Sequence, residues 1–213
     1  QQLLDAAWLS MRIAAVNATV AVVLGTLAAN ALVRHGRFRG RTGFDLLLTA
    51  PLVMPDVIIG LSLLLLFVAM QQAIGWPAGR GFTTIAIAHI TFSMAYVAVV
   101  VKSRLGQMDR SLEEAAMDLG ARPLTVYLRI TLPLIAPALL SGWLLAFTLS
   151  LDDLVIASFV AGPGSTTLPM VVYSSVRMGV SPQINALASL IVLFVSLAVI
   201  VAGLAMSRRG AGR

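Results

Sequence analysis

The feature that most constrains this chain is a series of long apolar segments. The hydrocarbon core of a bilayer requires about 20 mostly apolar residues per helix. Five segments meet this length, at 13–33, 44–70, 82–101, 134–161 and 184–206. Since a membrane-spanning helix satisfies its own backbone hydrogen bonds, the sequence predicts an all-α membrane protein, a polytopic helical bundle with five transmembrane helices. We expect a single transmembrane domain over residues 1–213.

The composition agrees with lipid as the solvent and excludes several kinds of site. Charged residues make up only 11% of the chain, whereas soluble domains carry about 25%. The net charge of +6 comes from short basic segments between apolar runs rather than from a stripe on a soluble surface, which argues against a nucleic-acid partner. With no cysteine, and with His35 and His89 far apart in sequence, we expect no metal site.

Two of the predicted spans contain residues that interrupt helices. The second carries Pro51 and Pro55, and the fourth carries Pro137, Gly142 and two acidic residues. Breaks at membrane depth are tolerated where the freed backbone groups face protein or a water-filled cavity. These two spans therefore predict a hinge or a cavity.

The positions of lysine and arginine predict the orientation of the chain, because short cytoplasmic loops are enriched in both. Twelve of the fifteen follow the first, third or fifth span, and only Arg12, Arg80 and Arg177 lie elsewhere. This distribution places the C-terminus in the cytoplasm and residue 1 outside. One further helix upstream would restore a cytoplasmic start, and we expect it.

The connection at 103–133 is too polar to span and too patterned to be a slack linker. Ser111 and Glu114 fit a capping box, which predicts a helix that begins at Ser111. Gly120 supplies a stop for this helix, and Pro123 suits the first turn of a second one. We therefore expect two short helices joined at a glycine.

The first of these helices has an apolar face with the spacing i, i+3, i+4 and i+7, formed by Leu112, Ala115, Ala116 and Leu119. A small projecting helix of this kind suits insertion into a groove of a partner protein. It could equally pack on its own bundle. The pattern alone leaves both interpretations open.

The residues of this segment resemble the EAA signature of the permease subunits of bacterial ABC importers. The resemblance is carried by Glu114, Ala115 and Ala116, by Gly120, and by Ile130, Leu132 and Pro133. It implies a MetI-like permease of the inner membrane, in which 103–133 holds a coupling helix that docks on a cytoplasmic ATPase dimer. The coupling residues it implies are Glu114, Ala115, Ala116, Asp118, Gly120 and Pro133.

The chain lacks a nucleotide-binding loop of its own. Such a loop ends in Gly-Lys-Ser or Gly-Lys-Thr, and the only lysine, Lys102, is preceded by Val101. We therefore expect no cofactor in this chain and no enzymatic activity. If ATP drives the process, ATP and magnesium bind to a partner ATPase.

Acidic residues inside spans are costly and often mark a pathway. Asp56, Asp152 and Asp153 are the candidates, with Ser150, Ser158 and Tyr173 as further pathway contacts. These carboxylates could favour a cation in transit, or each could be a structural acid that binds backbone or caps a helix break. Neighbouring residues on a helix point about 100° apart, so Asp152 and Asp153 cannot both line one wall. We expect His89 to hydrogen-bond a neighbouring helix rather than relay protons.

The residues that follow Ser150 are similar to those of polyamine permeases, the putrescine and spermidine family. The similarity lies in the runs 150–160, 162–164, 167–169 and 175–179. It implies a heterodimer with a sister permease, an ATPase dimer and a periplasmic binding protein that delivers a diamine. A permease for another small solute is the alternative; an ion-coupled secondary transporter would have no use for the segment 103–133.

Overall fold

Helices form nearly all of the structure, a computed structural model that describes residues 2–34, 38–178, 186, 189 and 193. The chain divides into two compact units, Gln1–Pro169 and Met170–Arg213. Apart from three isolated positions, the predicted fifth span at 184–206 lies outside the described residues. The single domain over 1–213 stays a prediction.

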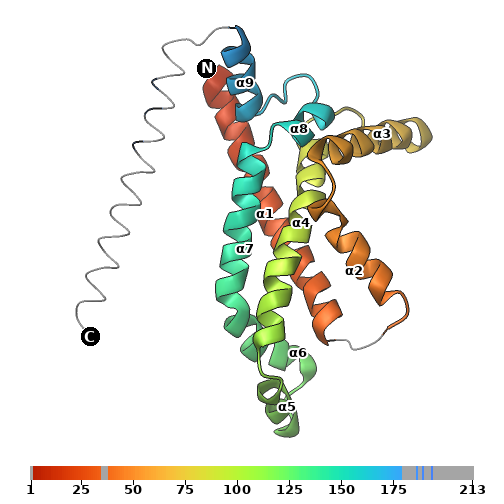
Figure 1. The fold of residues 1–213 in the computed structure, drawn as a ribbon, viewed down its shortest axis with the longest axis vertical. Helices are drawn as coiled ribbons and strands as arrows, with labels where there is room; N and C mark the ends of the chain where they lie inside the picture. Colours follow the sequence, from red (N-terminus) through yellow and green to blue (C-terminus); the bar gives the residue numbers. More distant parts are fainter. Residues whose placement is uncertain (1, 35–37, 179–185, 187–188, 190–192, 194–213) are drawn as a thin grey trace. The chain divides into compact units, whose positions relative to one another are not determined.

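Three long helices, α1 (Gln2–Arg34), α4 (Phe82–Gln107) and α7 (Leu132–Asp152), lie side by side and form the core of the first unit (Figure 1). Among the described residues, four helical segments are long and apolar enough to cross a membrane: Gln2–Arg34, Asp56–Ile74, Phe82–Gln107 and Pro123–Asp152. They correspond to the first four predicted spans, so the all-α membrane fold is confirmed.

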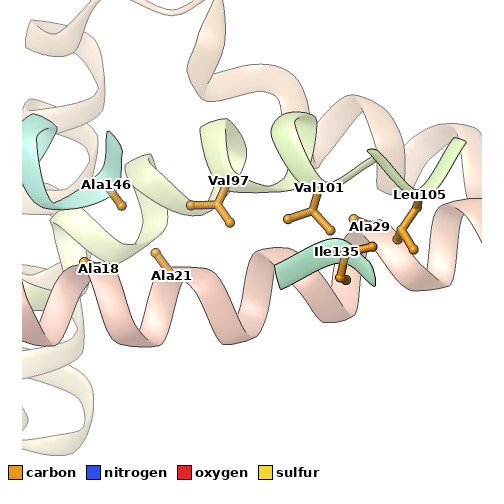
Figure 2. Packing of buried hydrophobic residues seen from close by; sticks show 8 residues of the cluster. All are labelled: Ala18, Ala21, Ala29, Val97, Val101, Leu105, Ile135 and Ala146. Carbon is orange, nitrogen blue, oxygen red and sulfur yellow. The ribbon is translucent and has the colours of Figure 1, made fainter. Parts of the chain in front are cut away.

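Small residues let the three core helices approach closely. A β-carbon added to Gly25 of α1 would lie 2.9 Å from Cγ1 of Val97 on α4, and one added to Gly142 of α7 would lie 3.3 Å from the same atom. Such residues are enriched where membrane helices meet, because helices in lipid associate through close packing of their backbones rather than through the hydrophobic effect. Figure 2 shows the buried cluster that results, formed by Ala18, Ala21, Ala29, Val97, Val101, Leu105, Ile135 and Ala146.

The second predicted span is broken into α2 (Arg41–Thr49), the 3-10 turn η1 (Ala50–Leu52) and α3 (Asp56–Ile74). Pro51 lies within the turn and Pro55 directly precedes α3. Proline lacks a backbone N–H and disfavours helical geometry at the residue before it, so the two prolines end one helix and allow the next to start in a new direction (Figure 1). The predicted interruption is confirmed.

The connection between the third and fourth spans folds as two short helices, α5 (Ser111–Asp118) and α6 (Pro123–Val126). They meet at Gly120, whose φ of +85° lies in the left-handed region that glycine adopts most readily. The start at Ser111, the glycine joint and the start at Pro123 are confirmed. The capping box is wrong: Arg110 is the N-cap, and the Ser111 N–H donates to Oδ1 of Asp109 at 2.9 Å.

A π-helical turn, η2 (Tyr127–Thr131), joins α6 to α7 in one helical segment. The N–H of Leu132 donates to the carbonyl of Tyr127, five residues earlier. The next residue, Pro133, has no N–H to donate. The wider turn is therefore where this helix adjusts to a proline, and π turns of this kind often mark functional positions.

The fourth predicted span also breaks, close to its two acidic residues. α7 ends at Asp152, Asp153 has an extended backbone with ψ of 123°, and α8 (Val155–Val160) begins two residues later. A further helix, α9 (Leu168–Met178), starts in the first unit and continues into the second.

Candidate functional site

The face of α5 that we predicted to meet a partner is exposed. None of the residues of α5 is buried, and Leu112 is 50% exposed, with Leu119, just after the helix, at 89%. Glu114, Ala115, Asp118 and Gly120 are exposed as well, while Ala116 is half-buried and Pro133 lies apart, exposed on α7. The structure thus gathers five of the six predicted coupling residues on one short helix and its glycine joint.

Polar contacts at Glu113 hold α5 to the bundle. Oε2 of Glu113 lies 3.1 Å from Nε of Arg34 at the end of α1, and Oε1 accepts a hydrogen bond from the Thr131 hydroxyl at 2.6 Å. The guanidinium of Arg110 also donates to the carbonyls of Val33 and Arg34, both at 3.3 Å. Nothing in the local sequence pattern predicts these contacts, because the partners of Glu113 lie far away in sequence.

A cavity of about 440 Å³ opens beside this contact. It is lined by residues of α1, α5, α6 and η2, among them Asn30, Arg34, Glu114 and Tyr127. The end of α1 and the α5–α6 segment therefore line an open cavity whose walls hold charged and apolar side chains, Arg110 and Met117 among them.

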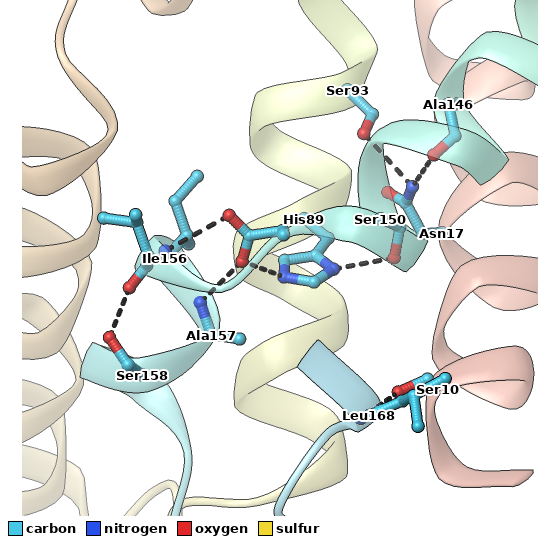
Figure 3. A network of polar contacts seen from close by, with 12 residues as sticks. Ser10, Asn17, His89, Ser93, Ala146, Ser150, Ile156, Ala157, Ser158 and Leu168 are labelled. Carbon is cyan, nitrogen blue, oxygen red and sulfur yellow. Dashed lines mark hydrogen bonds and ion pairs between the residues drawn. The ribbon is translucent and has the colours of Figure 1, made fainter. Parts of the chain in front are cut away.

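A second polar site is centred on His89 in α4, which is 2% exposed. Nδ1 lies 2.7 Å from Oγ of Ser150, and Nε2 lies 3.0 Å from Oδ2 of Asp153 (Figure 3). Since a carboxylate oxygen only accepts, the Nε2–H donates to Asp153, and in a neutral ring Nδ1 then accepts from the serine hydroxyl. His89 thus hydrogen-bonds a neighbouring helix as predicted, and it also contacts a titratable group that is distant in sequence.

Asp153 uses the rest of its carboxylate to cap α8. Oδ1 accepts from the backbone N–H of Ile156 at 3.2 Å, and Oδ2 accepts from that of Ala157 at 2.7 Å. Both oxygens are engaged, so the structural interpretation left open by the sequence fits Asp153. Asp153 thus faces His89 on the neighbouring helix α4, and the place of either acid in a pathway stays a prediction.

The other predicted pathway residues lie on neighbouring elements. Asp152 is exposed at the end of α7 and interacts electrostatically with Asp153, Asp56 and His89. Asp56 is the first residue of α3, directly after the predicted interruption of the second span, and it is exposed. Ser158 is exposed on α8 and donates to the carbonyl of Val155 at 2.7 Å. Over the described residues, no group of three or more histidine or acidic side chains is arranged to hold a metal ion.

Tyr173 belongs to the second unit and is described there by itself. It is 51% exposed, and the guanidinium of Arg177 lies 5.9 Å from the centre of its ring. This contact is a cation–π interaction between two residues one helical turn apart.

The chain is similar to known transport proteins along most of its length. The family model described as binding-protein-dependent transport system inner membrane component matches residues 21–208. The putrescine transport system permease protein PotI of Escherichia coli (strain K12) is 66% identical over 206 residues, which cover 97% of this chain and 73% of that protein. The spermidine/putrescine transport system permease protein PotC of the same strain is 43% identical over 206 residues, covering 97% and 75%.

Two solved structures share the fold. A chain of a bacterial ABC transporter involved in the import of the acidic polysaccharide alginate aligns with a TM-score of 0.64 and 18% identity, over 87% of this chain and 64% of that one. A chain of an amino acid ABC transporter aligns with a TM-score of 0.61 and 18% identity, over 92% and 88%. The predicted permease fold is therefore confirmed.

Proposed function

From the premise that this chain belongs to the family of binding-protein-dependent transport system inner membrane components, we propose that it imports putrescine or a related polyamine. Membership and the apolar helices make it a multi-pass inner membrane protein and a permease subunit rather than an enzyme. The observation that carries the substrate proposal is the 66% identity to a putrescine permease across 97% of the chain.

In this proposal α5 is the coupling helix that docks on a cytoplasmic ATPase dimer, and ATP and magnesium bind to that partner. Its support is the exposure of the apolar face of α5 and of Glu114 beside it. Gly120 ends the helix in a left-handed conformation that a β-carbon would strain. A sister permease completes the pore, a periplasmic protein delivers the substrate, and the C-terminus lies in the cytoplasm.

The pathway in this proposal passes the acids at the break between α7 and α8. Asp152 is exposed there and shares its electrostatic environment with Asp56. A diamine is a dication, so carboxylates along its path have the appropriate sign. Ser158 and Tyr173 are further candidates because both are exposed. A permease for another small solute is the alternative, and the sign of these charges would suit other cations equally well.

The test is uptake of labelled putrescine by proteoliposomes that hold the full-length protein, its sister permease and the ATPase, supplied with the periplasmic protein. Uptake that requires ATP and is reduced by unlabelled spermidine but not by a neutral solute is expected. Transport of another solute in place of putrescine would refute the substrate and retain the importer.

A glycine pair tests the coupling role. Gly120→Val and Gly75→Val each place a β-branched residue at positive φ, +85° and +72°, with no atom within 4 Å of the new β-carbon, so each is strained by about 1–2 kcal/mol. Only the first lies beside α5. Gly120→Val should lower the putrescine taken up per ATP hydrolysed, and Gly75→Val should not; equal effects would contradict the coupling role.

A further inference from the structure

We infer that Glu113 is the positioning residue that makes α5 move together with α1 and α7. This inference rests on the proposed function, in which α5 receives motion from an ATPase. It adds a link within this chain to the docking contact with the partner.

No apolar core holds α5 in place. This helix contributes no buried residue, and its apolar side chains face outward. A helix of eight residues is marginal by itself, so its position depends on the contacts that it makes with the rest of the chain. The side chains of α5 that turn toward the bundle therefore decide how a force on it is passed on.

The carboxylate of Glu113 joins three elements, α5, α1 and η2. Glu113 is 15% exposed and Arg34 is 12% exposed, so the pair is largely shielded from water. One oxygen faces Arg34 at the last residue of α1, and the other accepts from Thr131, which is itself 2% exposed. The hydrogen bond from Thr131 is short and therefore directional, and water screens the ion pair with Arg34 only weakly in such surroundings. Any displacement of α5 must either break these contacts or carry α1 and η2 with it.

Thr131, the hydrogen-bond partner of Glu113, lies at a point where the helical segment that contains α7 can bend. Thr131 is the last residue of the π turn, two residues before Pro133. Bends in helices occur at prolines and π turns, because the ladder of hydrogen bonds is interrupted there. A pull on Thr131 through Glu113 is therefore applied to the part of the α7 segment that bends most easily.

The experiment compares Glu113→Gln, Thr131→Val and the double variant in the reconstituted complex described above. Glutamine keeps an acceptor for Thr131 but loses the charge that faces Arg34, and valine removes the hydroxyl. Thr125→Val is the matched control, since Thr125 is exposed on α6. Putrescine taken up per ATP hydrolysed should fall by at least about fivefold in each single variant, the lower end of typical coupling between sites. The double variant should be no worse than the more affected single one.

Two outcomes would overturn the inference. One is an unchanged ratio of uptake to ATP hydrolysis in a fully assembled Glu113→Gln complex. The other is a parallel loss of uptake, ATP hydrolysis and assembled complex, which is what a purely structural role would give. If the wild-type complex hydrolyses ATP but does not move putrescine, the substrate proposal fails instead.

A second readout is independent of the substrate. Because the chain has no cysteine, spin labels can be attached at Leu27→Cys on α1 and Met117→Cys on α5, both at exposed positions and outside the apolar face of α5. The distance between the labels should be the same in the nucleotide-free and ATP-trapped wild-type complexes, and it should change between these states in Glu113→Gln. A change in the wild-type distance would overturn the inference.

Discussion

Replacing each acid of the Asp152 and Asp153 pair by asparagine separates a structural carboxylate from a pathway carboxylate. Asparagine at 153 keeps one acceptor oxygen and places an amide N–H₂ where the other oxygen accepts from backbone or from His89. A buried donor left without its acceptor costs about 1–3 kcal/mol, and loss of a helix cap costs about 0.5–2 kcal/mol. We therefore expect Asp153→Asn to lower the free energy of unfolding by about 2 kcal/mol, or about 30-fold in the ratio of folded to unfolded protein.

Asp152→Asn should leave the free energy of unfolding almost unchanged and should lower putrescine uptake. Its side chain is exposed, and surface substitutions change stability by less than about 0.5 kcal/mol. An exposed ion pair with a passing diamine contributes about 0.2–1 kcal/mol, so uptake at low putrescine should fall by up to about fivefold.

The assay is an SDS titration of each purified full-length variant, combined with uptake of labelled putrescine at equal amounts of assembled complex. Unchanged unfolding of Asp153→Asn, together with lost uptake, would refute its role as a cap. Undiminished uptake by Asp152→Asn would refute its place in the pathway.

Other substitutions test the core and the start of α5. Gly25→Val should destabilise the bundle by about 1–3 kcal/mol through overpacking against α4, whereas Gly106→Val, with no atom within 4 Å of its new β-carbon, should not; SDS titration measures both. Asn17→Leu removes hydrogen bonds to α4 and α7 and should cost about 1 kcal/mol at about 0.6 kcal/mol per bond, measured in the same way; an unchanged titration midpoint would contradict the role of the amide. The backbone N–H of Ser111 lowers the pKa of Asp109, so the carboxylate supports α5 above the usual carboxyl range and this support is lost as the pH falls through the lowered pKa. In Asp109→Ala, which removes the acceptor, amide exchange at the start of α5 at neutral pH should be faster than in the wild type, and equal rates would contradict the role of this carboxylate.

Local sequence signals predicted the elements of this fold well. Hydropathy located the first four spans, and the backbone conformations that Gly120 and Pro123 favour predicted the joint between α5 and α6. These features depend on neighbours along the chain. The capping box failed because Asp109, two residues before Ser111, accepts from the Ser111 N–H, which is the donor that the Glu114 carboxylate would take in a capping box. The pattern did not include that competing acceptor.

The candidate sites depend on contacts that local patterns do not contain. Glu113 contacts Arg34 and Thr131, which lie on two other helices, and the pattern within α5 does not indicate these partners. Likewise, the break after Asp152 turns the next carboxylate toward His89, 64 residues earlier in the chain. Hydropathy indicates that an acid in a span is costly, but not which side chain satisfies it.

The buried amide of Asn17 has a consequence for how the protein is made. Its hydrogen-bond partners lie 76 and 129 residues further along the chain, on α4 and α7. While the ribosome is still synthesising those helices, α1 enters the membrane with an amide that has not yet met them, a state that lipid penalises. A chain that stops before α7 therefore keeps the side-chain N–H₂ of Asn17 without its acceptor on that helix, the carbonyl of Ala146.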